Sequence, residues 1–421
     1  MRAGVAVAWL LVAGVAHAQQ DPDLAALSLQ SGAPQAEASP RAWQLFAEGG
    51  TGWSRIRTES LSNQTSSIQR LSADLRIDAT PLRGLRAVLS DRLDYADWPY
   101  QIEPNREVNT LREAYLSVQP SNSVIFDAGR INQYSGVAVG YNPTDFFRGG
   151  AVRSLVTLDP LSIKNNRQGS VMVRGQMLWD GGSVMALFSP KLASRANNAP
   201  FNPDWGSTNG VNRAMLIFSK RISANLNPQW LLYQEQGGSV QFGMNLTTLV
   251  NDSTVAYVEW SGGRRNTLLQ DALGQGGDKA FRNRLSTGFT YTTSNKLSLT
   301  FEYEYNGAGL DKGSWDALPA TSLPGYVRYQ QYAMTQQEMA TRHALLFYAT
   351  WQDVVINHLN LSALVRYSVA DRSNLSWLEL RYRWPHDEVA VQWLNNSGKL
   401  FSTFGASPLR TALELSYRHY F

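Results

Sequence analysis

From residue 43 to the end of the chain, hydrophobic and polar residues alternate in segments of about ten residues. In the segment 297–306, LSLTFEYEYN, every second residue is apolar or aromatic, as at Phe301, and the residues between them are polar, as at Glu302. A period of two residues is that of a β-strand with one apolar face and one polar face. The same division recurs in the segments 239–250 and 359–369. The pattern therefore predicts an all-β chain.

Eighteen such segments follow one another along the chain. They span 43–53, 68–78, 85–95, 109–118, 124–130, 168–179, 183–190, 213–222, 229–236, 239–249, 254–262, 283–293, 297–306, 342–351, 358–369, 374–384, 388–395 and 409–421. Every second connection is a short turn such as TPLRG or SNK, and the connections between these turns are mostly long. A soluble sandwich also alternates, but short turns at one end and long loops at the other are typical of a transmembrane barrel. We therefore expect an antiparallel transmembrane β-barrel of about 18 strands, with the short turns on the periplasmic side and the long loops on the extracellular side.

The last segment, LRTALELSYRHYF, alternates and ends on Phe421. It resembles the C-terminal strand through which the outer-membrane assembly machinery recognises its substrates, although His419 stands where an apolar or aromatic residue is usual. The whole pattern resembles the Gram-negative outer-membrane porin-type β-barrels. Strand number matches both the eighteen-stranded substrate-specific porins and the exopolysaccharide-export barrels, so no single family is identified. The resemblance implies an outer-membrane location, with lipid, lipopolysaccharide and the β-barrel assembly machinery as partners.

The N-terminus has the features of a secretory signal peptide. Arg2 precedes an apolar stretch over residues 3–16, and Ala16-His17-Ala18 fits the small-x-small cleavage pattern. Residues 19–42 are rich in Ala, Ser, Gln and Pro and contain no aromatic residue. We expect a signal peptide over 1–18 that is cleaved near Ala18, a periplasmic linker over 19–42 with one short helix capped by Asp21, and the barrel over 43–421.

Composition narrows the possible functions. The 421 residues include no Cys, which excludes a disulfide framework, a cysteine-ligated metal site and a thiol nucleophile. Mean hydropathy is −0.29, and no apolar run after residue 18 approaches the roughly 20 residues that a membrane-spanning helix needs. The formal net charge is +4, or +3 without Arg2, which is too small to indicate a nucleic-acid partner. We expect no cofactor.

The polar faces of the predicted strands carry more basic than acidic residues, and 31 of the 38 basic residues are Arg. Guanidinium groups hold carboxylates in a bidentate manner, so an Arg ladder would offer passing anions successive weak sites. Alternatively, these Arg residues pair with neighbouring Asp and Glu and do not determine the solute. The expected pore-lining residues are Arg70, Arg76, Arg86, Arg92, Arg174, Arg366, Arg381, Arg383, Arg410 and Arg418.

The connection over about 131–167 is long and contains apolar residues that an external loop has little reason to carry. Asn142-Pro143-Thr144-Asp145 has the chemistry of a helix start, and Gly149-Gly150 that of a helix end. General porins fold the connection after the fifth strand inward, and by this resemblance of position we expect a constriction loop with a short helix. The alternative is an external loop packed on its own aromatic residues. The constriction candidates are Arg130, Tyr134, Tyr141, Asp145, Arg148 and Arg153.

Enzyme chemistry has little support in the sequence. His343, His358, His386 and His419 are the histidines that remain after signal cleavage, and no serine motif accompanies them. Histidines and carboxylates are not spaced as metal ligands, so we expect no catalytic residue and no metal site. The sequence favours a channel for passive diffusion of small hydrophilic, anionic solutes. An export conduit for an acidic exopolysaccharide is the alternative, and an outer-membrane enzyme is a weaker one.

Overall fold

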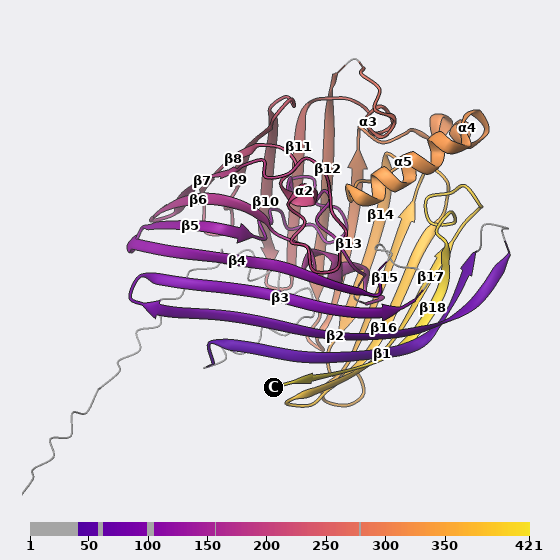
Figure 1. Cartoon of the computed structure of the whole chain (residues 1–421), viewed down its shortest axis with the longest axis horizontal. Helices are drawn as coiled ribbons and strands as arrows, with labels where there is room; N and C mark the ends of the chain where they lie inside the picture. Colours follow the sequence, from indigo (N-terminus) through magenta and orange to yellow (C-terminus); the bar gives the residue numbers. More distant parts are fainter. Residues whose placement is uncertain (1–40, 58–61, 99–104, 156, 278) are drawn as a thin grey trace, which may run out of the picture.

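The computed structural model describes residues 41–57, 62–98, 105–155, 157–277 and 279–421. The expected signal peptide and nearly all of the expected linker, with its helix, lie outside these residues. Each strand pairs antiparallel with the next along the chain. The last strand also pairs with the first, with Phe46 opposite Tyr420, and this pairing closes the sheet. The predicted eighteen-stranded antiparallel barrel is therefore confirmed (Figure 1).

The strands are β1 (Trp43–Arg57), β2 (Asn63–Leu82), β3 (Leu85–Asp97), β4 (Glu107–Ser121), β5 (Val124–Ile131), β6 (Ser170–Trp179), β7 (Gly182–Ser189), β8 (Arg213–Lys220), β9 (Gln229–Glu235), β10 (Gln241–Asn251), β11 (Thr254–Arg265), β12 (Ala280–Thr292), β13 (Leu297–Asn306), β14 (His343–Trp351), β15 (Leu359–Ser368), β16 (Asn374–Arg383), β17 (Asp387–Ser397) and β18 (Leu409–Tyr420). The helices are η1 (Pro160–Lys164), α2 (Trp205–Thr208), α3 (Leu268–Leu273), α4 (Lys312–Thr321) and α5 (Leu323–Thr335). Figure 1 shows α3, α4 and α5 at one end of the barrel and the C-terminus at the other. None of the helices in the described ranges has the length and apolar character needed to cross a membrane.

The two faces of the sheet differ as the alternation predicts. Outward side chains such as Phe289, Phe301 and Trp384 are exposed, whereas Glu302 and Glu304 on the inward face are completely buried. Their burial has a specific cause, because the described residues of the segment 132–169 (132–155 and 157–169) lie inside the barrel. This segment, which we call the inner loop, contacts β9 through Phe146 and β17 through Gln392. A loop that remained outside the barrel could not reach walls so far apart in the strand order.

The inner loop also explains an apolar patch on the inward face that the alternation did not predict. Leu346, Leu364, Trp377 and Leu394 come from β14 to β17 and point inward, where they pack with Leu158 of the inner loop. Because an apolar side chain is stabilised when it is removed from water, this patch holds the inner loop against the wall. A water-filled barrel without such a loop would have no use for these side chains.

The helix predicted from Asn142 to Gly150 is wrong. These residues form successive turns. Among the described residues of the inner loop the one helical turn is η1, which begins after Asp159, 17 residues beyond Asn142. Tertiary contacts take the groups that would have started the predicted helix. The Asn142 side chain donates to the carbonyl of Ala138, and Asp145 binds Arg167 at 2.5 Å. Phe146 stacks on the ring of Tyr233 of β9, and Phe147 meets the same ring edge-on.

Candidate pore and its constriction

Two carboxylates on the barrel wall hold the inner loop through its backbone. Five successive N–H groups, from Val137 to Tyr141, point at the wall. The first two donate to Glu259 of β11, and the other three donate to Glu302 of β13 over 2.7, 3.0 and 3.1 Å. Hydrogen bonds to an ionised acceptor are stronger than those to a neutral one. This arrangement, which we call the carboxylate clamp, fixes the loop at the middle of the barrel.

Small residues in the inner loop make the clamp possible. Gly136 has a φ of +98°, and a Cβ added there would lie 2.6 Å from Oε1 of Glu259. A Cβ on Gly140 would collide with Glu304 and Leu346 of the wall. Only glycine tolerates such a backbone conformation and such a close approach. The SGVAVG run at 135–140 therefore lets the backbone itself, without any polar side chain, meet the wall.

The η1 end of the inner loop docks on a different part of the wall, at β17. The side chain of Gln392 in β17 accepts from Thr157 over 2.8 Å and from the N–H of Leu158 over 3.1 Å. Asp159 caps η1 by accepting from the N–H of Leu161. Burial raises the pKa of Asp159 to about 7, and its neighbour Glu379 adds to the rise, while the Leu161 N–H and Arg381 oppose it. The docked position of η1 therefore depends on a carboxyl group that is easier to bury in its neutral form.

A second connection, residues 307–342, also reaches into the barrel. Its helices α4 and α5 pack with α3 through Trp315, Tyr326 and Tyr329 around Leu268. After α5, the carbonyl of Thr335 accepts from the N–H of Gly150 over 3.0 Å. The side chain of Gln337 donates to the carbonyl of Arg148 over 2.7 Å. The segment 335–338 thus lies directly on the inner loop.

Glu338 is the main polar link between these two connections. Its Oε1 lies 2.8 Å from Arg148, 3.1 Å from Arg284 and 3.8 Å from Arg265. Its Oε2 accepts from the Tyr141 hydroxyl over 2.6 Å and from the Asn306 amide over 3.1 Å. Burial alone would raise the pKa of Glu338, but the three guanidinium groups outweigh it and lower the pKa to about 2. The carboxylate is therefore ionised throughout the physiological range.

An open cavity of about 570 Å³, the outer cavity, lies at the end of the barrel that carries the long loops. The inner loop, the end of α5 and the strands β8 to β12 line it. The lining includes six basic side chains, Arg148, Arg213, Arg264, Arg265, Lys279 and Arg284, and four acidic ones, Asp145, Glu235, Asp271 and Glu338. Since Asp145 is itself paired with Arg167, positive charge predominates here.

Arg213 is unusual among these basic residues. Its guanidinium lies 4.4 Å from the centre of the Phe147 ring and donates to the hydroxyl of Ser170 over 2.9 Å. Within the described parts of the chain, no carboxylate lies within ion-pair distance of it. Arg213 is 7% exposed and forms no ion pair in the described ranges, although Glu235 of β9 lies opposite it in the strand register. Its charge therefore still favours an anion in the cavity.

A second open cavity of about 300 Å³, the inner cavity, lies toward the end with the short turns. Phe46, Arg76, Glu113 and Asn132 are among its lining residues. Arg167, which is 1% exposed, connects the two cavities. It donates over 2.6 Å to Asn132 of the inner cavity and over 2.5 Å to Asp145 of the outer one. One layer of inner-loop side chains therefore separates the two cavities.

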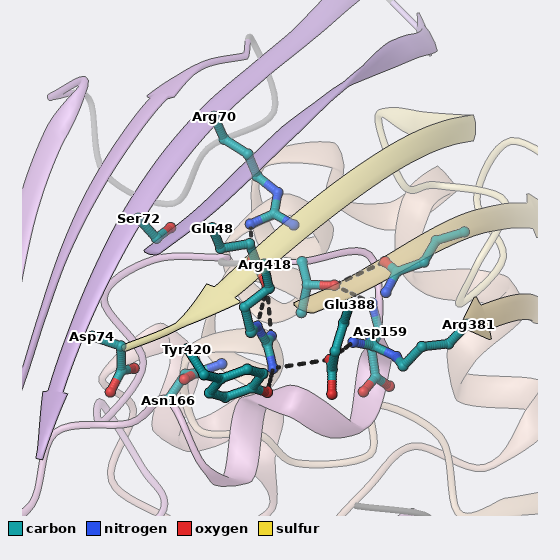
Figure 2. Close-up of polar contacts among 12 residues, drawn as sticks. Glu48, Arg70, Ser72, Asp74, Asp159, Asn166, Arg381, Glu388, Arg418 and Tyr420 are labelled. Carbon is teal, nitrogen blue, oxygen red and sulfur yellow. Dashed lines mark hydrogen bonds and ion pairs between the residues drawn. The ribbon is translucent and has the colours of Figure 1, made fainter. Parts of the chain in front are cut away.

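Most of the expected pore-lining Arg residues gather around the closure of the barrel, and they are paired with carboxylates. Arg418 of β18 binds Glu48 over 2.5 Å, lies 3.7 Å from Glu388, and donates to the Tyr420 hydroxyl (Figure 2). The same pattern holds for the rest of this group, with the pairs Arg70 to Glu48 and Glu414, Arg76 to Asp78 and Glu113, Arg86 to Asp78, Arg92 to Asp74 and Asp94, Arg381 to Glu379 and Glu388, and Arg383 to Glu388.

The remaining three expected pore-lining residues lie apart from this group. Arg174 pairs with Asp127 on β5 over 2.7 Å, and Arg366 pairs with Glu304 over 2.6 Å. Arg410 donates to the carbonyl of Gly405 and has no carboxylate within ion-pair distance among the described residues. The alternative interpretation, in which Arg pairs with neighbouring Asp and Glu, thus describes nine of the ten positions.

The constriction candidates fall into two groups. Tyr134, Tyr141, Asp145 and Arg148 lie in the buried part of the inner loop. Arg130 and Arg153 instead support the connection 190–212. Arg130 donates to the carbonyl of Pro203 over 2.6 Å, and Arg153 donates to those of Ala199 and Asn202 over 3.0 and 2.6 Å. Neither residue is among those that line the two cavities.

Sequence reasoning missed Glu259, Glu338, Arg167 and Arg213 as site residues. Glu259 could have been found, because it lies on the polar face of an alternating segment opposite a glycine-rich loop. The other three have no local signal, since tertiary structure alone brings them to their partners. Arg167 binds within the inner loop, Arg213 lies against the Phe147 ring, and Glu338 meets both the inner loop and the strands β11 to β13. Across the described ranges, no group of three or more His, Cys, Asp or Glu is arranged to hold a metal ion.

Comparisons with known proteins identify the fold. No protein-family model and no curated protein sequence matches the chain. Among solved structures it is similar to OccAB1 of Acinetobacter baumannii, with a TM-score of 0.54, 11% identity, and coverage of 90% of this chain and 96% of that one. It is also similar to OccAB4 of the same organism (0.51, 9%, 90% and 97%) and to OccK7 of Pseudomonas aeruginosa (0.51, 10%, 90% and 98%). At these identities the likeness shows a shared fold, that of a porin-type barrel.

Proposed function

We propose that this chain is an outer-membrane channel through which small hydrophilic solutes, with a preference for anions, diffuse passively. The porin-type fold supports a place in the outer membrane of a Gram-negative bacterium. The two cavities at opposite ends of the barrel support a path along its axis, because a single layer of inner-loop side chains separates them.

The excess of positive charge in the outer cavity is the observation that carries the preference for anions. Basic side chains exceed acidic ones there by six to four, and Arg213 forms no ion pair within the described residues. The field of such a cavity raises the local concentration of anions and slows the entry of cations. The paired arginines at the barrel closure contribute less, because each of their charges is largely cancelled by a nearby carboxylate.

Single-channel recording tests this proposal. The chain without its expected signal peptide is refolded into a planar bilayer and recorded under a gradient of KCl. The expected result is steady conductance with a reversal potential on the chloride side. A reversal potential on the potassium side would refute the preference for anions, and a barrel without any conductance would refute the channel.

The proposal also covers the partners of the chain and its lack of enzymatic chemistry. Lipid, lipopolysaccharide and the assembly machinery that reads the C-terminal strand are its proposed partners, and the chain is proposed to act without enzymatic chemistry. Export of an acidic exopolysaccharide would need a continuous basic track, and the pairing of nine of the ten expected arginines with carboxylates does not favour it.

A further inference from the structure

Glu338 is surrounded by the groups that would bind a solute anion. Three guanidinium groups, one hydroxyl and one amide converge on its two oxygens. Guanidinium groups that form two parallel bonds are the usual protein ligands of carboxylate and phosphate. The convergence therefore resembles a complete oxyanion site in which the anion belongs to the chain itself.

This site lies at the edge of the outer cavity. All five residues that carry these groups come from the inner loop or from β11 to β13: Tyr141 and Arg148 from the inner loop, Arg265 from β11, Arg284 from β12 and Asn306 from β13. Arg148, Arg265, Arg284 and Glu338 are all among the cavity's lining residues. A solute anion in the cavity would reach the same guanidinium groups without passing any other barrier.

Glu338 lies directly after the last turn of α5. Gln337 has a φ of +52° and is the left-handed residue that ends the helix, and the N–H of Glu338 donates to the carbonyl of Ala333 over 2.8 Å. The segment 335–338 contacts the inner loop through Glu338, which binds Arg148 and Tyr141, and through the hydrogen bonds of Thr335 and Gln337. When these contacts break, the segment can leave the inner loop together with the last turn of α5.

We propose that Glu338 is a built-in anion that occupies an oxyanion site of the outer cavity, and that a solute carboxylate or phosphate displaces it. Displacement breaks the link between Glu338 and Arg148, so the segment 335–338 separates from the inner loop and widens the passage. The inference rests on the proposed channel function. A ligand shifts the equilibrium between a closed and an open state only if it binds them with different affinity. The solute anion does so, because Glu338 fills the oxyanion site in the closed state and leaves it vacant in the open state.

The test compares the wild-type channel with Glu338→Gln at neutral pH. Inorganic phosphate replaces chloride step by step at constant ionic strength, so that general screening stays the same. In the wild type, the open fraction should rise with phosphate and then saturate, by roughly threefold or more. In Glu338→Gln it should be high already without phosphate and should not rise further, because the built-in anion has gone.

Glu388 provides a matched control. It also faces three guanidinium groups, those of Arg381, Arg383 and Arg418, but it is part of strand β17 and cannot leave. Glu388→Gln therefore changes the charge of the barrel interior by the same amount and should keep the saturable response to phosphate. If it lost the response as Glu338→Gln does, the effect would be one of charge and the proposal would be wrong.

A reversible cross-link gives a second readout. The chain has no native cysteine, and a Cβ on Gly149 would touch the side chain of Gln336. In the double variant Gly149→Cys and Gln336→Cys, the oxidised form should be insensitive to phosphate and the reduced form should respond. An anion-preferring channel whose open fraction ignores phosphate would overturn this inference and leave the proposed function standing. A reversal potential on the potassium side would instead refute the proposed function.

Discussion

Glu302→Gln should loosen the inner loop without unfolding the barrel. Oε1 of Glu302 accepts from the N–H groups of Gly140 and Tyr141, and Oε2 accepts from the N–H of Val139 and the hydroxyl of Tyr257. A glutamine keeps one acceptor oxygen and presents an N–H₂ group in place of the other. With the N–H₂ group at the Oε1 position, the hydrogen bonds from Gly140 and Tyr141 are both lost. At the Oε2 position the bond from Val139 is lost, while the Tyr257 hydroxyl can accept instead. In either position the acceptor also loses its charge, which weakens the hydrogen bonds that remain.

The expected size of the effect on the docking of the inner loop follows from the charge of the acceptor. A hydrogen bond to a charged group contributes about 1.5 to 3 kcal/mol, so the lost bonds together with the lost charge cost on the order of 3 kcal/mol. The ratio of docked to undocked inner loop should therefore fall about a hundredfold, since 1.4 kcal/mol corresponds to a factor of ten in an equilibrium constant. The strands keep their own hydrogen bonds, so the barrel as a whole should retain its thermal stability.

Amide hydrogen exchange measures this directly. The amides of residues 139–141 should exchange about a hundredfold faster in the variant, and the single-channel current should become noisier. Glu48→Gln is the control, because Glu48 is equally buried and binds Arg70 and Arg418. The carboxylate clamp would be refuted if exchange at residues 139–141 were unchanged in Glu302→Gln. It would also be refuted if Glu48→Gln accelerated exchange at these residues to the same extent.

Four further outcomes are expected. Deletion of residues 136–150 should raise conductance, because it removes both the carboxylate clamp and Arg148; unchanged conductance would place the loop outside the pathway. Arg213→Gln should reduce the preference for anions more than Arg86→Gln does, as judged by reversal potential, since Arg86 is already paired with Asp78. Because the pKa of Asp159 is raised to about 7, docking of residues 157–164 should be tightest well below pH 7 and weaken as pH rises through 7, and Asp159→Asn should abolish this dependence in hydrogen exchange. Because the pKa of Glu338 is lowered to about 2, its link to Arg148 should persist from pH 7 to pH 4 and fail only as pH approaches 2; phosphate-independent opening at pH 4 would contradict this.

The strands could be predicted from the sequence because their signal is local. In the segment Leu297–Asn306 the period of two alone decides which residues face lipid, and the structure keeps this order. The inward apolar residues Leu346 and Trp377 were not predicted by the same reasoning, because the partner that makes them favourable is Leu158, which lies 188 and 219 residues earlier in the chain. Alternation describes a strand against water or lipid, and it contains no information about a loop that folds into the lumen.

The candidate site was predictable in part for the same reason. Inward arginines follow from the alternation, but their partners follow from the register. Arg70 meets Glu414 only because β1 joins β2 to β18, across 344 residues of sequence. The predicted helix at Asn142 failed because capping chemistry is a weak preference that the pairing of Asp145 with Arg167 overrides. Glu338 belongs to a loop segment whose position no local pattern determines.

The central claim is that solutes cross this barrel with a preference for anions that originates in the outer cavity. The most direct test is the reversal potential of the Arg213→Gln, Arg265→Gln double variant beside that of the wild type, under the same gradient of KCl. The account predicts conductance in both, with a clear chloride preference in the wild type that is largely lost in the variant. An equal chloride preference in both channels, or a preference for potassium in the wild type, would contradict it.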